Sequence, residues 1–211
     1  MLSLLFNSPV YFLVFALSLV VAVTIHEFAH AWVADKLGDP TPRINDRLTL
    51  NPLAHLDPIG TLALLIVHVG WGKPVPIDPY NLKNPRRDAA LISLAGPASN
   101  LILALLLSLL LKLPLPPSGQ LILNSLAVFI YPLITLSVGL GIFNLLPFPP
   151  LDGAKILLGF LPQELADAYE ETLNRYGIIL LALLIFPLFG GRSLFNSLIS
   201  PLISAIIDLL I

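Results

Sequence analysis

The chemistry-bearing residues of this chain begin with two histidines four positions apart, His26 and His30, with Glu27 between them. Residues four apart on a helix lie on one face, so both imidazoles can reach one metal ion. Glu27 lies one position round the helix, where its carboxylate can take a proton from a water that the metal activates. The run from His26 to His30 is therefore an HExxH pattern, which is typical of metal-assisted hydrolysis.

A catalytic zinc site normally has three protein ligands and one open position, so a third ligand must come from elsewhere in the chain. The chain has no cysteine, which leaves His, Asp and Glu as ligand types. Asp152 is the strongest candidate, because it follows a long apolar run and a proline-rich break and precedes Gly153, which permits a close approach. Asp152 could also cap a helix that starts near Ala154, and the two roles are compatible. His55 and His68 are weaker candidates, and His55 is better explained as a hydrogen-bonded structural residue.

The composition indicates that these residues lie in a membrane protein. The chain has 211 residues, of which 56 % are hydrophobic and 11 % charged, and its mean hydropathy is +0.89. Soluble proteins average about 25 % charged residues, so the composition excludes an ordinary soluble domain and a disordered chain. The formal net charge is −2 and there is no basic stripe, so we expect no nucleic-acid partner. The expected surroundings are a lipid bilayer.

Several apolar runs are long enough, or nearly long enough, to be membrane segments. A transmembrane helix needs about 20 apolar residues, and the runs that we assign to membrane segments are 9–34, 59–69, 89–111, 121–146, 177–189 and 194–211. The run 59–69 is short for a full crossing, and the glycines and prolines of 71–77 favour extended chain after it. We predict an all-α polytopic membrane protein with five or six transmembrane segments and a possible re-entrant extended segment around 71–77.

The rest of the chain fits one membrane domain over residues 1–211, with a core at 9–153 and C-terminal membrane segments at 177–211. Residues 162–176 carry a run of charges and are predicted to form a surface helix. No Lys or Arg precedes the first apolar run, which disfavours a cleaved signal peptide.

Positive charges suggest an orientation in the membrane. If 59–69 does not fully cross, seven cations lie on one side: Lys36, Arg43, Arg47, Lys73, Lys83, Arg86 and Arg87. The positive-inside rule then predicts that this side is cytoplasmic and that the active site lies nearer to it.

Two asparagines in the predicted spans need hydrogen-bond partners if they are buried. Asn144 lies eight residues before Asp152 and either orients a substrate backbone, stabilises an oxyanion or makes an interhelical hydrogen bond. Asn100 has the same alternatives, with the interhelical bond favoured. Gly96 and Ala98, which precede it, suit close helix packing.

Together these motifs resemble the site-2 protease family of intramembrane zinc metalloproteases, in its compact prokaryotic branch without PDZ or CBS domains. The resemblance rests on His26-Glu27-x-x-His30, Gly96-Pro97-Ala98-Ser99-Asn100, Asn144-Leu145-Leu146-Pro147 and Leu151-Asp152-Gly153. It extends to Asn51-Pro52, to Asp57-Pro58-Ile59-Gly60 and to Lys73-Pro74-Val75-Pro76. The resemblance implies that His26, His30 and Asp152 bind one zinc ion, that Glu27 is the general base, and that the protein lies in a prokaryotic cell membrane.

We therefore expect an intramembrane zinc endopeptidase that cuts within or near a transmembrane segment of a single-pass or small membrane protein. A helical substrate hides its peptide bonds, so it must be unwound, and an exposed strand edge can hold the unwound chain by β-augmentation. The segment 71–77 is the best-placed edge, with an ordinary loop as the alternative. The candidate substrate-binding residues are Asn144, Asn100, Lys73 and Val75.

Two rival functions use the same residues. A membrane metal-binding protein or cation transporter would use the His/Asp site without hydrolysis, but a transporter is expected to carry polar residues along a path through the bilayer. Here the polar residues cluster at one level. A proteolytically silent scaffold is disfavoured by the intact Glu27, and nothing in the sequence predicts an oligomeric state.

Overall fold

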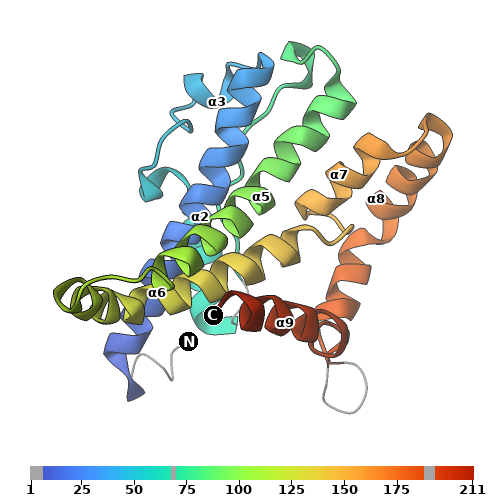
Figure 1. Cartoon of the computed structure of the whole chain (residues 1–211). Coiled ribbons are helices and arrows are strands. Elements are labelled where there is room, and N and C mark those ends of the chain that lie inside the picture. Colours follow the sequence, from blue (N-terminus) through green and yellow to red (C-terminus); the bar gives the residue numbers. More distant parts are fainter. Residues whose placement is uncertain (1–6, 68–69, 188–192) are drawn as a thin grey trace.

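Helices make up the regular structure of this chain (Figure 1). The structure is a computed structural model that describes residues 7–67, 70–187 and 193–211. Within these ranges there is no strand, and the only strand-like pairing is an isolated antiparallel bridge between Leu56 and Gly72. The all-α prediction is confirmed.

Three long apolar helices form the body of the molecule: α2 (Pro9–Leu37), α5 (Pro85–Leu111) and α6 (Pro117–Asn144). Each starts with a proline, whose missing N–H is not needed in the first turn of a helix. Helices of this length extend about 40 Å, more than the hydrocarbon thickness of about 30 Å. Among the described residues these are the three helices long and apolar enough to cross a membrane, so the predicted five or six spans are not confirmed.

Helices α2 and α5 run antiparallel, side by side (Figure 1). His30 of α2 contacts Ile92 of α5, and His26 contacts Asn100, so the residue numbers run in opposite directions along the contact. The end of α2 and the start of α5 therefore lie at the same end of this helix pair, and the connection 38–84 joins them there. Its helix α4 (Pro58–Val67) has 10 residues and spans about 15 Å, roughly half the hydrocarbon thickness.

The connection between α2 and α5 also contains short helical turns and residues 71–77, the segment that the sequence predicts to be extended and that is called the extended segment below. The turns are α3 (Thr41–Ile44), η1 (Pro52–Ala54) and η2 (Pro79–Asn81). Residues 71–77 have no regular secondary structure apart from the isolated bridge at Gly72. The side chain of Asp39 is buried and accepts hydrogen bonds from the backbone N–H groups of Thr41 and Asp78, which ties the end of this segment to the end of α2.

The C-terminal part consists of α7 (Asp152–Phe160), α8 (Gln163–Ile185), a π-helical turn η3 (Phe195–Ile199) and α9 (Ser200–Leu210). The helix predicted over 162–176 is present, but its predicted end is wrong, because α8 continues into the following apolar stretch as far as Ile185. Ala166, Leu173 and Gly177 are buried at spacings of seven and four, so one stripe of the helix is buried from its first turn as far as Gly177, where the apolar part begins.

Candidate metal centre

His26, His30 and Asp152 come together between α2 and the start of α7. Nε2 of His26 lies 3.0 Å from Oδ2 of Asp152, and Nε2 of His30 lies 3.3 Å from the same oxygen. One ligand atom from each residue lies within 4.8 Å of the others. Both histidines are buried, and Asp152 is largely enclosed. The structure thus brings together the three residues that the sequence predicted as ligands.

The hydrogen-bonding partners show that these side chains suit a cation between them. The Ile92 carbonyl can only accept, so Nδ1 of His30 carries the proton that it donates there at 2.7 Å. A neutral His30 then turns an unprotonated Nε2 toward a carboxylate oxygen. Two ligands of a tetrahedral zinc ion, each about 2.0–2.1 Å from it, lie about 3.3 Å apart, which matches the two nitrogen–oxygen separations. The three residues fit a zinc ion.

Helix α5 leaves room for this group by presenting Gly96 to the two rings. A Cβ built on Gly96 would collide with Nε2 of His30 and would lie 2.6 Å from Nε2 of His26. The predicted close packing at Gly96 is therefore packing against the two candidate ligands.

Asp152 is positioned by the tight break between α6 and α7. A Cβ on Gly153 would collide with the backbone carbonyls of Leu145 and Leu146, so only glycine fits this return of the chain. Helix α7 begins at Asp152 itself, with Leu151 in the N-cap position, and the Asp152 carboxylate reaches the histidines. The Asp152 side chain therefore contacts the two imidazoles, and the N-cap role that the sequence offered as an alternative falls to Leu151.

Arg86, at the start of α5, holds the other end of α7. Its Nε donates to the Leu158 carbonyl at 2.6 Å, its Nη2 to the Leu161 carbonyl at 2.5 Å and its Nη1 to Gln163 at 2.7 Å. The last carbonyls of a helix lack partners within the helix, so this side chain completes α7 and fixes the helix that carries Asp152.

Glu27 lies on the side of α2 that faces the extended segment. A Cβ on Gly72 would lie 3.6 Å from Oε1 of Glu27, and the backbone of Val75 also approaches this carboxylate. The predicted general base and the predicted strand edge are therefore neighbours.

Arg47 fixes the extended segment in this place. Its guanidinium is buried and donates to the carbonyls of Lys73 and Pro74, the latter at 2.8 Å. The Lys73 N–H donates to the His55 carbonyl at 2.8 Å. Both backbone groups of Lys73 are thus bonded within the chain. This role could not be predicted from the sequence, where Arg47 is one of seven cations and no spacing rule separates it from the exposed Arg43.

His55 has the structural role predicted for it. Its side chain is fully buried, Nε2 donates to the Thr49 carbonyl at 2.8 Å, and Nδ1 lies 3.5 Å from Nη2 of Arg47. It does not join the metal-binding group found among the described residues. His68 lies outside the described residues.

The surroundings of His55 predict a pH-dependent stability. Burial lowers its pKa, the Thr49 carbonyl raises it and the Arg47 guanidinium lowers it, so the pKa lies below the usual value of about 6.5. Neutral His55 therefore contributes stability that is complete above about pH 6.5 and is lost as the pH falls through the window below it. We expect the Tm of the detergent-purified protein to fall more steeply between about pH 7 and pH 5 than that of His55→Gln. Parallel curves for the two proteins would contradict this expectation.

The two asparagines lie in different surroundings. Asn100 is fully buried, and its Nδ2 lies 3.2 Å from Nδ1 of His26, so it makes the interhelical hydrogen bond that the sequence favoured. Asn144, at the end of α6, is half-buried and donates to the Leu140 carbonyl of its own helix at 2.9 Å. The substrate-binding roles of these residues, and of Lys73 and Val75, stay predictions.

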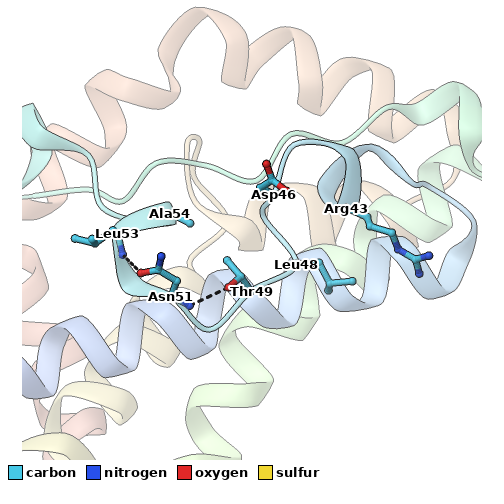
Figure 2. A pocket seen from close by; sticks show the side chains of 7 residues that line it. All are labelled: Arg43, Asp46, Leu48, Thr49, Asn51, Leu53 and Ala54. Carbon is cyan, nitrogen blue, oxygen red and sulfur yellow. Dashed lines mark hydrogen bonds between the residues drawn. The ribbon is translucent and has the colours of Figure 1, made fainter.

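A separate surface pocket lies on the loop between α3 and η1 (Figure 2). It has a volume of about 750 Å³ and is lined by Arg43, Asp46, Leu48, Thr49, Asn51, Leu53 and Ala54. Two hydrogen bonds join residues that line this pocket: the Asn51 N–H donates to the Thr49 hydroxyl and the Leu53 N–H to the Asn51 side chain, each at 3.1 Å. None of the candidate metal ligands lines it, so it is distinct from the metal centre.

A helical protein with three apolar helices and a buried His–His–Asp group that fits zinc is an integral membrane metalloprotein. Comparison with known proteins gives the family: the description "Peptidase family M50" matches residues 14–116 and 114–184. A relative named "Putative zinc metalloprotease YwhC" from Bacillus subtilis (strain 168) is 40 % identical over 175 residues, covering 82 % of this chain and 80 % of the relative.

Two further relatives carry the name "Putative zinc metalloprotease Rip2". The one from Mycolicibacterium smegmatis is 34 % identical over 171 residues, covering 79 % of this chain and 64 % of the relative. The one from Mycobacterium tuberculosis is 32 % identical over 177 residues, covering 81 % and 66 %. No solved structure matches the chain. The chain belongs to peptidase family M50, the site-2 protease family, and is a zinc metalloprotease.

Proposed function

We propose that this protein is an intramembrane endopeptidase that hydrolyses a peptide bond within or near a transmembrane segment of a single-pass or small membrane protein. The observation that supports the proposal most directly is the position of His26, Glu27 and His30 within the apolar helix α2. Polar side chains at this depth are costly and are by default functional. The membership in a membrane protease family implies a membrane protein substrate and a lipid bilayer.

In this proposal His26, His30 and Asp152 are the zinc ligands. Zinc, when bound, polarises a carbonyl group and lowers the pKa of a water toward about 7. Glu27 takes the proton of the attacking water and passes it to the nitrogen of the leaving amine.

The extended segment beside Glu27 is proposed to hold the unwound substrate as an added strand. The backbone of Gly72 and of Val75 lies next to Glu27. The Arg47 guanidinium donates to the carbonyls of Lys73 and Pro74, and the Lys73 N–H donates to the His55 carbonyl. Val75 then contributes through its backbone. Lys73 contributes through its side chain, which is exposed.

Arg47→Met tests this placement, because the variant frees the two carbonyls that the guanidinium holds. We expect kcat/KM toward a model substrate to fall by about tenfold or more, as expected when a positioning contact is lost, while zinc stays bound. Arg43→Met is the matched control, since that side chain is exposed and its ion pair is with Asp35 of α2, not with the extended segment. Equal activity of the wild type and Arg47→Met would show that the position of the segment does not matter.

The topology is proposed to comprise five or six membrane-embedded segments, with residues 59–69, 177–189 and 194–211 added to the three long helices. The membrane is that of a bacterial cell, and the end of the molecule where α2 ends and α5 starts faces the cytoplasm. The chain has no cysteine, so Lys83→Cys provides a single label site at that end. Labelling of intact cells by a membrane-impermeant maleimide would contradict the orientation.

A cleavage assay tests the function itself. A panel of purified, tagged single-pass model substrates, whose transmembrane segments differ in glycine and proline content, is incubated with the protein in liposomes, and mass spectrometry locates the cuts. We expect cuts within or next to the apolar segment that disappear on chelation and return with zinc. Cuts confined to the soluble tails would contradict an intramembrane reaction. Zinc flux into proteoliposomes without any cleavage would favour the transporter.

A further inference from the structure

Asn100 of α5 lies behind His26, on the ring nitrogen that points away from Asp152. Its Nδ2 is 3.2 Å from Nδ1 of His26, whose Nε2 lies 3.0 Å from Oδ2 of Asp152. The Asn100 side chain is fully buried. One imidazole therefore has the candidate metal group on one nitrogen and a buried amide on the other.

The chemistry of the imidazole decides which end of the amide must face it. A neutral imidazole carries one proton, so a histidine that binds a metal through Nε2 carries the proton on Nδ1 and needs a hydrogen-bond acceptor there. The orientation in the structure suits the other tautomer, in which Nδ2 of Asn100 donates to Nδ1 of His26. Turning the amide by 180° places Oδ1 against Nδ1 instead, and the amide assignment of an asparagine has to be made from such a network.

The oxygen of Asn100 supports the reversed orientation. Oδ1 is buried and has no hydrogen-bond partner among the described residues, although buried polar atoms are nearly always paired. Turned toward His26, the same oxygen accepts the Nδ1 proton. The rotation therefore gives the oxygen a partner and frees Nε2 of His26 for a metal, while Nδ2 moves to the position in which the oxygen has no partner among the described residues.

His30 has the same arrangement with a backbone group in place of the amide. Its Nδ1 donates to the Ile92 carbonyl at 2.7 Å, and its Nε2 lies 3.3 Å from Asp152. Helix α5 thus contacts the Nδ1 atom of both rings, through Ile92 and Asn100, which lie about two turns apart along the helix. At His30 the acceptor is a backbone carbonyl, whereas at His26 it is a side chain that mutation can change.

We infer that Asn100 is a positioning residue of the zinc centre, whose side-chain oxygen accepts the Nδ1 proton of His26 and fixes its tautomer and ring direction. The inference rests on the proposed role of His26 as a ligand. This role replaces the substrate contact predicted for Asn100, because a fully buried side chain can support His26 without reaching the substrate.

The test is the zinc affinity of the purified protein, measured by competition with a chromophoric chelator. Asn100→Leu removes the acceptor while it keeps the branched shape of the side chain, and it is expected to weaken zinc binding by about 10- to 100-fold, as for other partners of metal-bound histidines. Asn100→Asp offers only acceptor oxygens and is expected to bind zinc within about threefold of the wild type. Ser108→Ala is the control, since it removes another interhelical hydrogen bond of α5, to Leu210, away from the metal group, and is expected to leave zinc affinity unchanged.

The variants separate the possible failures. Wild-type affinity in Asn100→Leu, or an affinity in Asn100→Asp that is tenfold or more weaker on the same scale, overturns the inference, and the second result does so even if Asn100→Leu fails to fold. Asp152→Ala is measured alongside. Full zinc affinity in Asp152→Ala overturns the proposed ligand set instead, whereas zinc loss there with wild-type affinity in Asn100→Leu overturns the role of Asn100 alone.

Discussion

Replacing Glu27 by glutamine is expected to abolish proteolysis and to leave zinc bound. Glutamine has the shape of glutamate but cannot take a proton from water at neutral pH, and a general base contributes about 10²- to 10⁴-fold to a rate. We expect kcat to fall by at least about 100-fold with little change in KM, because the lost interaction belongs to the transition state. The assay is cleavage of a model membrane substrate, with zinc content measured on the same preparation.

Glu164→Gln is the control for this substitution. Glu164 is exposed in the first turn of α8, away from the metal group. Glu164→Gln therefore makes the same chemical change as Glu27→Gln at a position outside the proposed active site. Cleavage by Glu27→Gln at the wild-type rate would mean that another group takes the proton. Loss of zinc in Glu27→Gln would mean that this residue belongs to the ligand set.

Gly96→Ala is expected to remove zinc binding. The added methyl group would collide with Nε2 of His30 and would lie 2.6 Å from Nε2 of His26, so the rings must move or α5 must withdraw from α2. We expect zinc affinity to fall by about 100-fold or more, the upper end of what changes around metal ligands cost. The measurement is equilibrium zinc competition together with Tm.

Gly139→Ala provides the matched control in another apolar helix. A Cβ built on Gly139 meets nothing within 4 Å, so the variant is expected to retain zinc and to gain slightly in helix stability. Wild-type zinc affinity in Gly96→Ala would contradict the close approach of α5 to the two histidines.

The three long helices could be predicted from the sequence because hydrophobic length alone defines them. The run 9–34 corresponds to α2, and the run 121–146 to α6, with shifts of a few residues at the ends. The weak point was the boundary inside α8. There the sequence changes from charged to apolar at Gly177, but the helix continues to Ile185, and its buried residues Ala166, Leu173 and Gly177 lie on one stripe that reaches this boundary. A sharp change of composition therefore does not mark the end of a helix.

The metal centre was partly predictable for a similar reason. The spacing of His26 and His30 determines that they share a face, and the Pro-rich break with Gly153 marked Asp152 as a residue brought in from afar. The sequence favoured an interhelical hydrogen bond for Asn100, but the partner of Asn100 and the contacts of Arg47 could not be inferred, because each depends on which segment packs beside it. Arg47 and Arg43 look alike in the sequence, yet one is buried against the extended segment and the other pairs at the surface.

The ligand set is tested most directly by the metal content of the detergent-purified protein, wild type beside Asp152→Ala, which requires no substrate. A site with two histidines and one carboxylate predicts about one zinc ion per chain in the wild type and a clear loss in Asp152→Ala. Tm measured on both proteins shows whether the variant is folded. Full zinc content in a folded Asp152→Ala, or no tightly bound zinc in the wild type, would contradict the three-ligand centre on which the proposed mechanism depends.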